Sequence, residues 1–329
     1  KQAKGAGMKP TPYKHLKTLR LWKAAAEDAG VAAVAEVLRN GKAELALTML
    51  EFMDAGVTPG GCAALGDALM LGANASLQVL RLDMNMGIGD DGVRELCKGL
   101  RTNRTLQKLT LSYCGVGPAG AAALADVIAS PLSALVHLDV MGNSLGAEGL
   151  LSLAIAAQRS KTLKELVLRD NGIGGGTVIS YIAAHGGAGG GGAARAAALA
   201  AAGGAGAMSS VGVVLSGAGA GAPDALESMA TVDVALSEAA ATAASATKVA
   251  LEELGRAMAD PAVPLASVNL ELNSITADEA AVLVPFMKDN TKMQVLTIDT
   301  TLPADIFSVL CRTGVSAKGK KKVVKKKKK

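Results

Sequence analysis

Two short glycine motifs in this chain have the spacing that binds nucleotide phosphates in many proteins. Residues 87–92 read G-x-G-x-x-G, and residues 115–120 repeat the same spacing. A loop of this kind presents backbone N–H groups at the start of a helix, where they bind pyrophosphate. However, the second motif follows the first by one period of the internal repeat described below. We therefore interpret both motifs as turns of that repeat rather than as a nucleotide site.

Histidines, which often carry catalysis or bind metals, are few. His15, His137 and His185 form no ligand pair at helical spacing, and the chain has no G-x-S-x-G or G-x-x-x-x-G-K-[ST] motif. His137 and Asp139 lie on the same face of an expected strand, so their side chains could touch. Beyond this pair the sequence offers no catalytic constellation. We expect no catalytic residue, no metal ligand and no cofactor.

The four cysteines are Cys62, Cys97, Cys114 and Cys311, and no two of them form a C-x-x-C pair. This spacing excludes a zinc ribbon or a thioredoxin-type motif and argues against a disulfide framework. The first residues carry no secretory signal, although the chain begins at Lys1 rather than at Met. We therefore expect an intracellular, reducing location.

The composition favours an aliphatic core and gives no membrane span. The chain has 329 residues, of which 50% are hydrophobic but only 2% aromatic, and the mean hydropathy is +0.32. Its longest uncharged stretch, residues 196–223, consists mostly of Ala, Gly and Ser. These residues contribute little to membrane insertion, which Leu, Ile, Val and Phe drive. We predict no transmembrane helix.

Charge is unevenly distributed along the chain. Residues 318–329 hold nine lysines and no acid, residues 1–23 are also basic, and the body between them is acidic. A block of lysines stays extended and binds acidic polymers such as nucleic acid, anionic lipid headgroups or acidic protein tails. A solubilising or targeting tail is the alternative. The predicted contacts are Lys320, Lys321, Lys322, Lys325, Lys326, Lys327, Lys328 and Lys329.

A pattern of apolar residues recurs along the chain. Its clear copies begin at Leu77, Leu106, Leu135, Leu163, Leu265 and Met293, and two weaker copies begin at Leu16 and Leu47. The first four clear copies start 29, 29 and 28 residues apart. The leading residue of each copy is counted as position 0. Apolar side chains at positions 3 and 5 alternate as in a short strand, and an Asn or Cys usually stands at position 8. The rest of each copy is an amphipathic helix, so neighbouring copies must stack to cover their apolar faces.

This pattern resembles the leucine-rich repeat, and its length is similar to that of the ribonuclease-inhibitor subtype. The resemblance covers about residues 16–182 and 265–310. It implies an α/β solenoid, or horseshoe, with parallel strands on the concave face and helices outside. The subtype is similar to several intracellular families: NOD-like receptor sensor domains, tropomodulin-like actin cappers, Ran GTPase-activating proteins, and repeat subunits of ciliary and axonemal complexes.

An insertion interrupts the repeats. Residues 183–222 contain 16 Ala and 13 Gly, a composition that buries too little surface to offset the entropy of ordering. We expect a flexible loop there, followed by a helix that restores the repeat near residue 250. The resulting division is a basic segment at 1–15, repeats at 16–182, the insertion with its helix at 183–250, C-terminal repeats and a cap at 251–317, and the lysine-rich tail at 318–329.

The concave face is the predicted site for protein partners. Its side chains stand at positions 2, 4 and 6 of each copy, with Tyr113 beside them at position 7 as an aromatic anchor. The predicted contacts are Arg81, Asp83, Lys108, Thr110, Ser112, Tyr113, His137, Asp139, Glu165, Arg169, Asn269 and Glu271.

Three functions remain open. The leading one is a non-catalytic scaffold for protein–protein interaction in a large intracellular assembly, such as the axoneme of a cilium or flagellum, whose lysine tail binds the acidic tails of tubulin in microtubules. The resemblance to Ran GTPase-activating proteins suggests GTPase regulation as an alternative. That family has an acidic C-terminal tail, whereas the tail of this chain is basic. The third is an adaptor for RNA or the ribosome, with non-specific binding through lysine–phosphate contacts.

Overall fold

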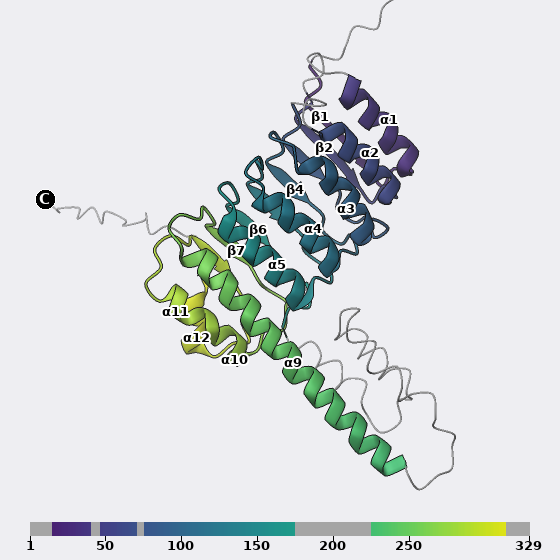
Figure 1. Ribbon diagram of the computed structural model, residues 1–329. Helices are drawn as coiled ribbons and strands as arrows, with labels where there is room; N and C mark the ends of the chain where they lie inside the picture. The colour runs from purple at the N-terminus through teal and green to yellow at the C-terminus, as the bar shows by residue number, and fades with distance from the viewer. Residues whose placement is uncertain (1–14, 41–46, 71–75, 175–224, 314–329) are drawn as a thin grey trace, which may run out of the picture.

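Strands and helices alternate along the chain and build a single open sheet covered on one side by helices (Figure 1). The computed structural model describes residues 15–40, 47–70, 76–174 and 225–313. The Ala/Gly-rich part of the insertion, with His185, and the tail lysines lie outside these residues. The predicted α/β solenoid is confirmed.

Among the described residues, the sheet has nine strands in sequence order. Eight of them run parallel, namely β1 (Thr18–Trp22), β2 (Met49–Met53), β3 (Val79–Arg81), β4 (Lys108–Thr110), β5 (His137–Asp139), β6 (Glu165–Val167), β7 (Ser267–Asn269) and β8 (Val295–Thr297). The short β9 (Arg312–Thr313) pairs antiparallel with β8 and ends the sheet. β6 pairs directly with β7, so the insertion leaves the sheet continuous.

The helices pack side by side on the outer face of the sheet (Figure 1). They are α1 (Glu27–Asn40), α2 (Pro59–Leu69), α3 (Gly89–Leu100), α4 (Pro118–Ala129), α5 (Gly146–Arg159) and α9 (Ala225–Ala259). In the repeat after β7 the helix is split into α10 (Ala277–Ala280), the 3-10 turn η1 (Ala281–Leu283) and α11 (Val284–Met287). Pro285 lies in this segment and lacks the N–H that a continuous helix would need. α12 (Ala304–Leu310) follows β8.

α9 is longer than the helix of an ordinary repeat. Its C-terminal part packs beside α5 and buries Leu251, Leu254 and Met258, whereas its N-terminal part continues past the stack of helices (Figure 1). Gln158 of α5 donates hydrogen bonds to the backbone carbonyl and the carboxylate of Glu253, at 2.9 and 2.8 Å. The insertion therefore returns to the solenoid through a helix that takes the ordinary place of a repeat helix.

The core is a row of aliphatic side chains between the sheet and the helices. The position-3 residues of consecutive copies stand opposite one another in the register of the sheet and are 0–1% exposed: Leu50, Leu80, Leu109, Leu138, Leu166, Val268 and Leu296. Each buried leucine contributes on the order of 2 kcal/mol through removal of apolar surface from water. The alternation read from the sequence thus places the expected side chains in the core.

In several copies a buried asparagine after the strand joins the copy to the preceding one. Asn85 accepts hydrogen bonds from the N–H groups of Ala55 and Val57, at 2.9 and 3.1 Å, and donates to the carbonyls of Phe52 and Leu82. Asn143 makes the corresponding bonds one copy after Cys114. Cys114 takes this position in its own copy, and its thiol donates to the Leu82 carbonyl at 3.1 Å. The hydrogen bonds predicted for position 8 are therefore present at Asn85 and Asn143.

Candidate protein-binding face

The concave face is formed by the side chains at positions 2, 4 and 6 of strands β1 to β8. On β3 to β7 these side chains form hydrogen bonds and ion pairs that run from one strand to the next. Their partners come from neighbouring strands because parallel strands with the same register place equivalent residues next to each other.

Three of the predicted contact residues lie below this surface. Asp83 accepts hydrogen bonds from the Thr110 hydroxyl and from the Ser112 backbone N–H, both at 2.9 Å. The Ser112 hydroxyl donates in turn to Asp139 at 3.1 Å. Asp83, Thr110 and Ser112 are 3–6% exposed, so this chain of hydrogen bonds fixes β3, β4 and β5 together and offers little surface to a partner. Only half-buried Asp139 remains accessible among the four.

His137 lies closer to Glu165 of the next strand than to a partner on its own strand. Its Nδ1 is 2.6 Å from a Glu165 carboxylate oxygen, and its Nε2 is buried without a hydrogen-bond partner. Asp139, expected beside it, instead bonds Ser112 and the Met141 N–H. The suggested His137–Asp139 contact is therefore replaced by a pair that links β5 to β6.

The remaining predicted residues are accessible at least in part. Lys108 on β4 is half-buried and forms no ion pair within the described residues. Arg169 pairs with Glu271 at 2.8 Å across the junction at which the insertion leaves the repeats. Asn269 is half-buried, and its side chain accepts a hydrogen bond from the Glu271 N–H. Together with Glu165, these residues give the face its mixed charge.

Tyr113 stands at position 7, where the backbone adopts the left-handed conformation. The equivalent residues Met84 and Leu272 share this conformation, with φ of +63° and +58°, and all three side chains are exposed. The Tyr113 ring lies against Gly142, the position-7 residue of the next copy, where a Cβ atom would stand 2.2 Å from the ring. A left-handed conformation costs non-glycine residues roughly 1–2 kcal/mol. The large apolar residues at position 7 therefore do not stabilise the backbone conformation that they adopt.

Sequence reasoning missed a cluster at the N-terminal end of the concave face. Glu51 is 1% exposed and accepts from the Trp22 indole N–H at 3.0 Å, while Arg20 and Arg81 pair with its carboxylate at 3.0 and 3.5 Å. The Arg20 guanidinium lies 5.9 Å from the centre of the Trp22 ring. Trp22 remains 57% exposed. Applying positions 4 and 6 to the weak copy that begins at Leu16 would have identified Arg20 and Trp22.

The glycine motifs form turns of the repeat. Asp90, within the first motif, accepts hydrogen bonds from the N–H groups of Gly117 and Gly120 at 2.6 and 2.8 Å. These amides begin α4 and belong to the second motif. A carboxylate therefore occupies the place that a phosphate would take at this helix terminus.

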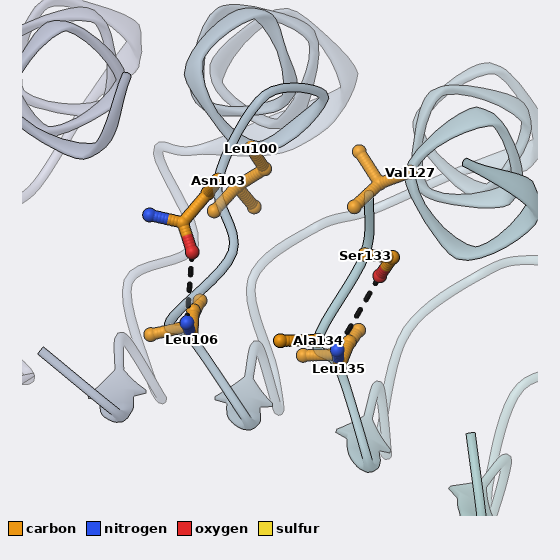
Figure 2. Close-up of a pocket in the computed structure, with 7 residues that line it drawn as sticks. All are labelled: Leu100, Asn103, Leu106, Val127, Ser133, Ala134 and Leu135. Carbon is orange, nitrogen blue, oxygen red and sulfur yellow. Dashed lines mark hydrogen bonds between the residues drawn. The ribbon is translucent and has the colours of Figure 1, made fainter. Parts of the chain in front are cut away.

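A small hollow between the repeats of β4 and β5 is lined mainly by apolar residues (Figure 2). Its polar side chains bond the backbone of their own loops: Asn103 accepts from the Leu106 N–H at 2.7 Å, and Ser133 accepts from the Leu135 N–H at 3.3 Å. Among the described residues, no group of three or more His, Cys, Asp or Glu side chains is arranged to hold a metal ion.

The cysteines are free thiols. Burial raises the pKa of Cys62, Cys97 and Cys114 to about 12, so these three thiols stay protonated near neutral pH. They act as small apolar core residues. No helix in the described ranges is both long enough and apolar enough to span a bilayer.

Comparison with known proteins agrees with the repeat architecture. A family model described as "Leucine Rich repeat" matches residues 73–97, 102–125, 133–154 and 159–176. The chain is 31% identical to human "NACHT, LRR and PYD domains-containing protein 5" over 192 residues, which cover 50% of the chain and 16% of that protein. It is 33% identical to mouse ribonuclease inhibitor and 32% identical to pig ribonuclease inhibitor, over 45% and 50% of the chain.

The matched part spans 32% and 35% of the two ribonuclease inhibitors, so the chain corresponds to about a third of their length. The family model matches copies that carry the strand, the turn after it and the outer helix. The chain therefore contains leucine-rich repeats, and these repeats are of the ribonuclease-inhibitor-like type.

Proposed function

We propose that the chain is a non-catalytic scaffold that binds protein partners through its concave face. The observation that carries this proposal is the pre-ordered row of charged side chains on adjacent strands. Buried bonds such as Asp83–Thr110 hold the strands in place, while Arg20, Glu165 and Trp22 remain accessible. Arg, Trp and Tyr are the residues that most often dominate binding energy at interfaces.

The relatives support the same kind of activity. Ribonuclease inhibitor, by its name, acts on a protein. The chain has the same type of repeat. An extended row of polar side chains on a sheet is typical of a site that binds a protein surface, whereas small molecules bind in enclosed pockets.

We further propose that the lysine tail binds an acidic polymer, with the acidic tails of tubulin as the first candidate. This choice places the chain in the cytoplasm or cytoskeleton, in an assembly such as the axoneme of a cilium or flagellum. The nine lysines of residues 318–329 and the absence of acids among them support attraction to such tails. Free thiols at Cys62, Cys97 and Cys114 are compatible with a reducing compartment.

Co-sedimentation with microtubules across a salt series tests the tail. The full chain is compared with a full-length variant in which the eight predicted contact lysines of the tail become glutamine, on intact microtubules and on microtubules whose acidic tubulin tails have been removed. The proposal predicts binding that needs both the lysines and the tubulin tails and that weakens as salt rises. A chain that stays in the supernatant at low salt contradicts the tubulin assignment.

The same preparation separates the alternatives. An adaptor for RNA would bind RNA through the tail without sequence preference and with a steep loss of affinity in salt. RNA would then displace the chain from microtubules. A GTPase regulator similar to Ran GTPase-activating proteins would accelerate GTP hydrolysis by Ran, which the scaffold proposal does not predict.

A further inference from the structure

The first and the last described strands of the sheet differ in how their outer edges are covered. At the C-terminal end, β9 pairs with β8, and Arg312 donates hydrogen bonds to the carbonyls of Met287, Met293 and Asn290, the first two at 2.7 and 3.3 Å. At the N-terminal end, β1 pairs only with β2 within the described residues. Leu19 and Leu21 of β1 are accordingly half-buried, whereas the equivalent Leu50 and Phe52 of β2 are fully buried.

The edge of β1 away from β2, which no described strand covers, presents a regular set of backbone groups. Lys23 donates its N–H to the Met53 carbonyl at 2.9 Å, and the Lys17 carbonyl accepts from the Thr48 N–H at 2.9 Å. Alternate residues of a parallel strand turn their backbone groups to opposite edges. Thr18, Arg20 and Trp22 therefore turn their N–H and C=O groups away from β2, as a template for a further strand.

The side chains along this edge indicate which residue types an added strand would carry. No acidic residue occurs between His15 and Ala26, and neither Lys17 nor Lys23 has an ion pair within the described residues. Trp22 and Leu16 are 57% and 39% exposed and provide apolar surface along the same segment of chain. Glu51 holds Arg20 and Trp22 in position through bonds to its buried carboxylate.

We propose that the β1 edge binds an extended acidic segment of a partner protein, which adds to the sheet as a further strand. Backbone hydrogen bonds to Thr18, Arg20 and Trp22 would align the segment, and its carboxylates would face Lys17 and Lys23. A second copy of this chain fits the edge less well, because edge-to-edge pairing would bring the basic strands of both copies together. Arg20 and Trp22 belong both to this edge and to the concave face, whereas Lys108 on β4 and Glu165 on β6 belong to the concave face alone.

Binding of a short fluorescein-labelled peptide of alternating valine and glutamate tests the proposal. The variant is Thr18→Pro, and the matched control is Thr18→Val. Proline removes the outward N–H of Thr18 and leaves the β1–β2 hydrogen bonds intact, and proline is tolerated at the first residue of a strand. Valine keeps the N–H. We expect roughly tenfold weaker peptide binding for Thr18→Pro and unchanged binding for Thr18→Val.

Hydrogen exchange locates the bound peptide, since the lysine tail also attracts acidic peptides. The proposal predicts slower exchange of the residue 18, 20 and 22 amides in the wild-type chain, and no affinity for the matched valine–lysine peptide. If Thr18→Pro does not fold, the double variant Lys17→Glu with Lys23→Glu replaces it and should lose the valine–glutamate peptide.

Three results would overturn the proposal. The first is equal peptide binding by Thr18→Pro and Thr18→Val, or unchanged exchange in β1. The second is equal affinity for the valine–lysine peptide. The third is a dimer of the wild-type chain, detected by sedimentation and lost in Thr18→Pro, which would assign the edge to a second copy. The tail and the charge at Lys108 and Glu165 are unchanged in these variants, so a failure here is distinct from failure of the proposed scaffold function.

Discussion

At the scale of single residues, one buried side chain satisfies several backbone groups of two repeats at once. Asn143 accepts from the N–H groups of Cys114 and Val116, both at 3.0 Å, and donates to the Leu111 and Val140 carbonyls, both at 2.8 Å. A buried backbone group without a partner costs about 1–3 kcal/mol. The turn between neighbouring copies therefore depends strongly on this residue.

Replacing Asn143 should measure that dependence. Asn143→Leu leaves these N–H and C=O groups without partners, and we expect it to lower the free energy of unfolding by about 3 kcal/mol in urea titrations. Asn143→Cys is the matched control. It should cost less, because the thiol of Cys114 in the same position of the preceding copy bonds a backbone carbonyl. A loss below about 1 kcal/mol for Asn143→Leu would show that the turn does not rely on the asparagine.

Cysteine reactivity gives a second residue-scale prediction. Cys62, Cys97 and Cys114 are buried with pKa values raised to about 12, while Cys311 is half-buried. With iodoacetamide at pH 8, mass spectrometry should find Cys311 alkylated first and the other three only after unfolding in urea. Alkylation of Cys62 as fast as that of Cys311 in the folded chain would contradict this burial.

At the scale of elements, an acidic residue at the start of one helix caps the next helix. Asp28 of α1 accepts from the Thr58 backbone N–H at 2.9 Å and from the Thr58 hydroxyl, at the start of α2. Asp90 of α3 does the same for α4. Carboxylates are favourable at helix N-termini because they satisfy free N–H groups and oppose the positive end of the helix dipole.

The cap at Asp28 makes stability depend on pH. Partial burial acts to raise the pKa of Asp28, but hydrogen bonds from the Thr58 side chain and from the Thr58 and Gly61 backbone outweigh it, so the pKa lies below its usual 3.8. A carboxyl whose folded pKa is lowered stabilises the fold above its unfolded pKa, and this contribution disappears as the pH falls through the folded pKa.

Asp28→Asn keeps the shape of the side chain and removes its charge. We expect it to cost about 1 kcal/mol of unfolding free energy at pH 7, and we expect the difference from wild type to shrink below pH 3.8. Urea unfolding of both proteins from pH 7 to pH 3 measures this change. A difference that stays constant over that range would mean that the charge of Asp28 does not stabilise α2.

At the scale of the whole molecule, the repeat architecture could be predicted because each copy specifies its own strand and turn. The apolar residues at positions 3 and 5 lie in the core, and Asn85 and Asn143 make the expected bonds. Spacing within one copy carries this information. The sequence also predicts the insertion, because Leu265 begins the next clear copy after Leu163 and lies far beyond one regular period from it.

Contacts between copies were harder to predict, because they depend on how close neighbouring strands bring short side chains. Asp83, Thr110 and Ser112 alternate as exposed polar residues would, yet they bond one another and are buried. The Asp90 cap and the Glu51 cluster likewise join residues from different copies. The position of a residue within the repeat predicts the face of the sheet on which its side chain lies. It does not predict how exposed that side chain is.

The central claim, that the concave face binds protein partners, is tested most directly by a charge swap on that face. Lys108→Glu with Glu165→Lys reverses two accessible charges on β4 and β6 and keeps the net charge. Glu95→Lys with Lys98→Glu is the matched control, because it swaps an ion pair on the outer face of α3. Each chain is used to capture proteins from an extract of its own cells, quantified by mass spectrometry.

The account predicts that wild type and the α3 control capture the same proteins, and that the concave swap loses them by roughly tenfold or more. Unchanged capture by the concave swap, or a loss confined to the α3 control, would contradict the claim and place partner binding elsewhere on the molecule.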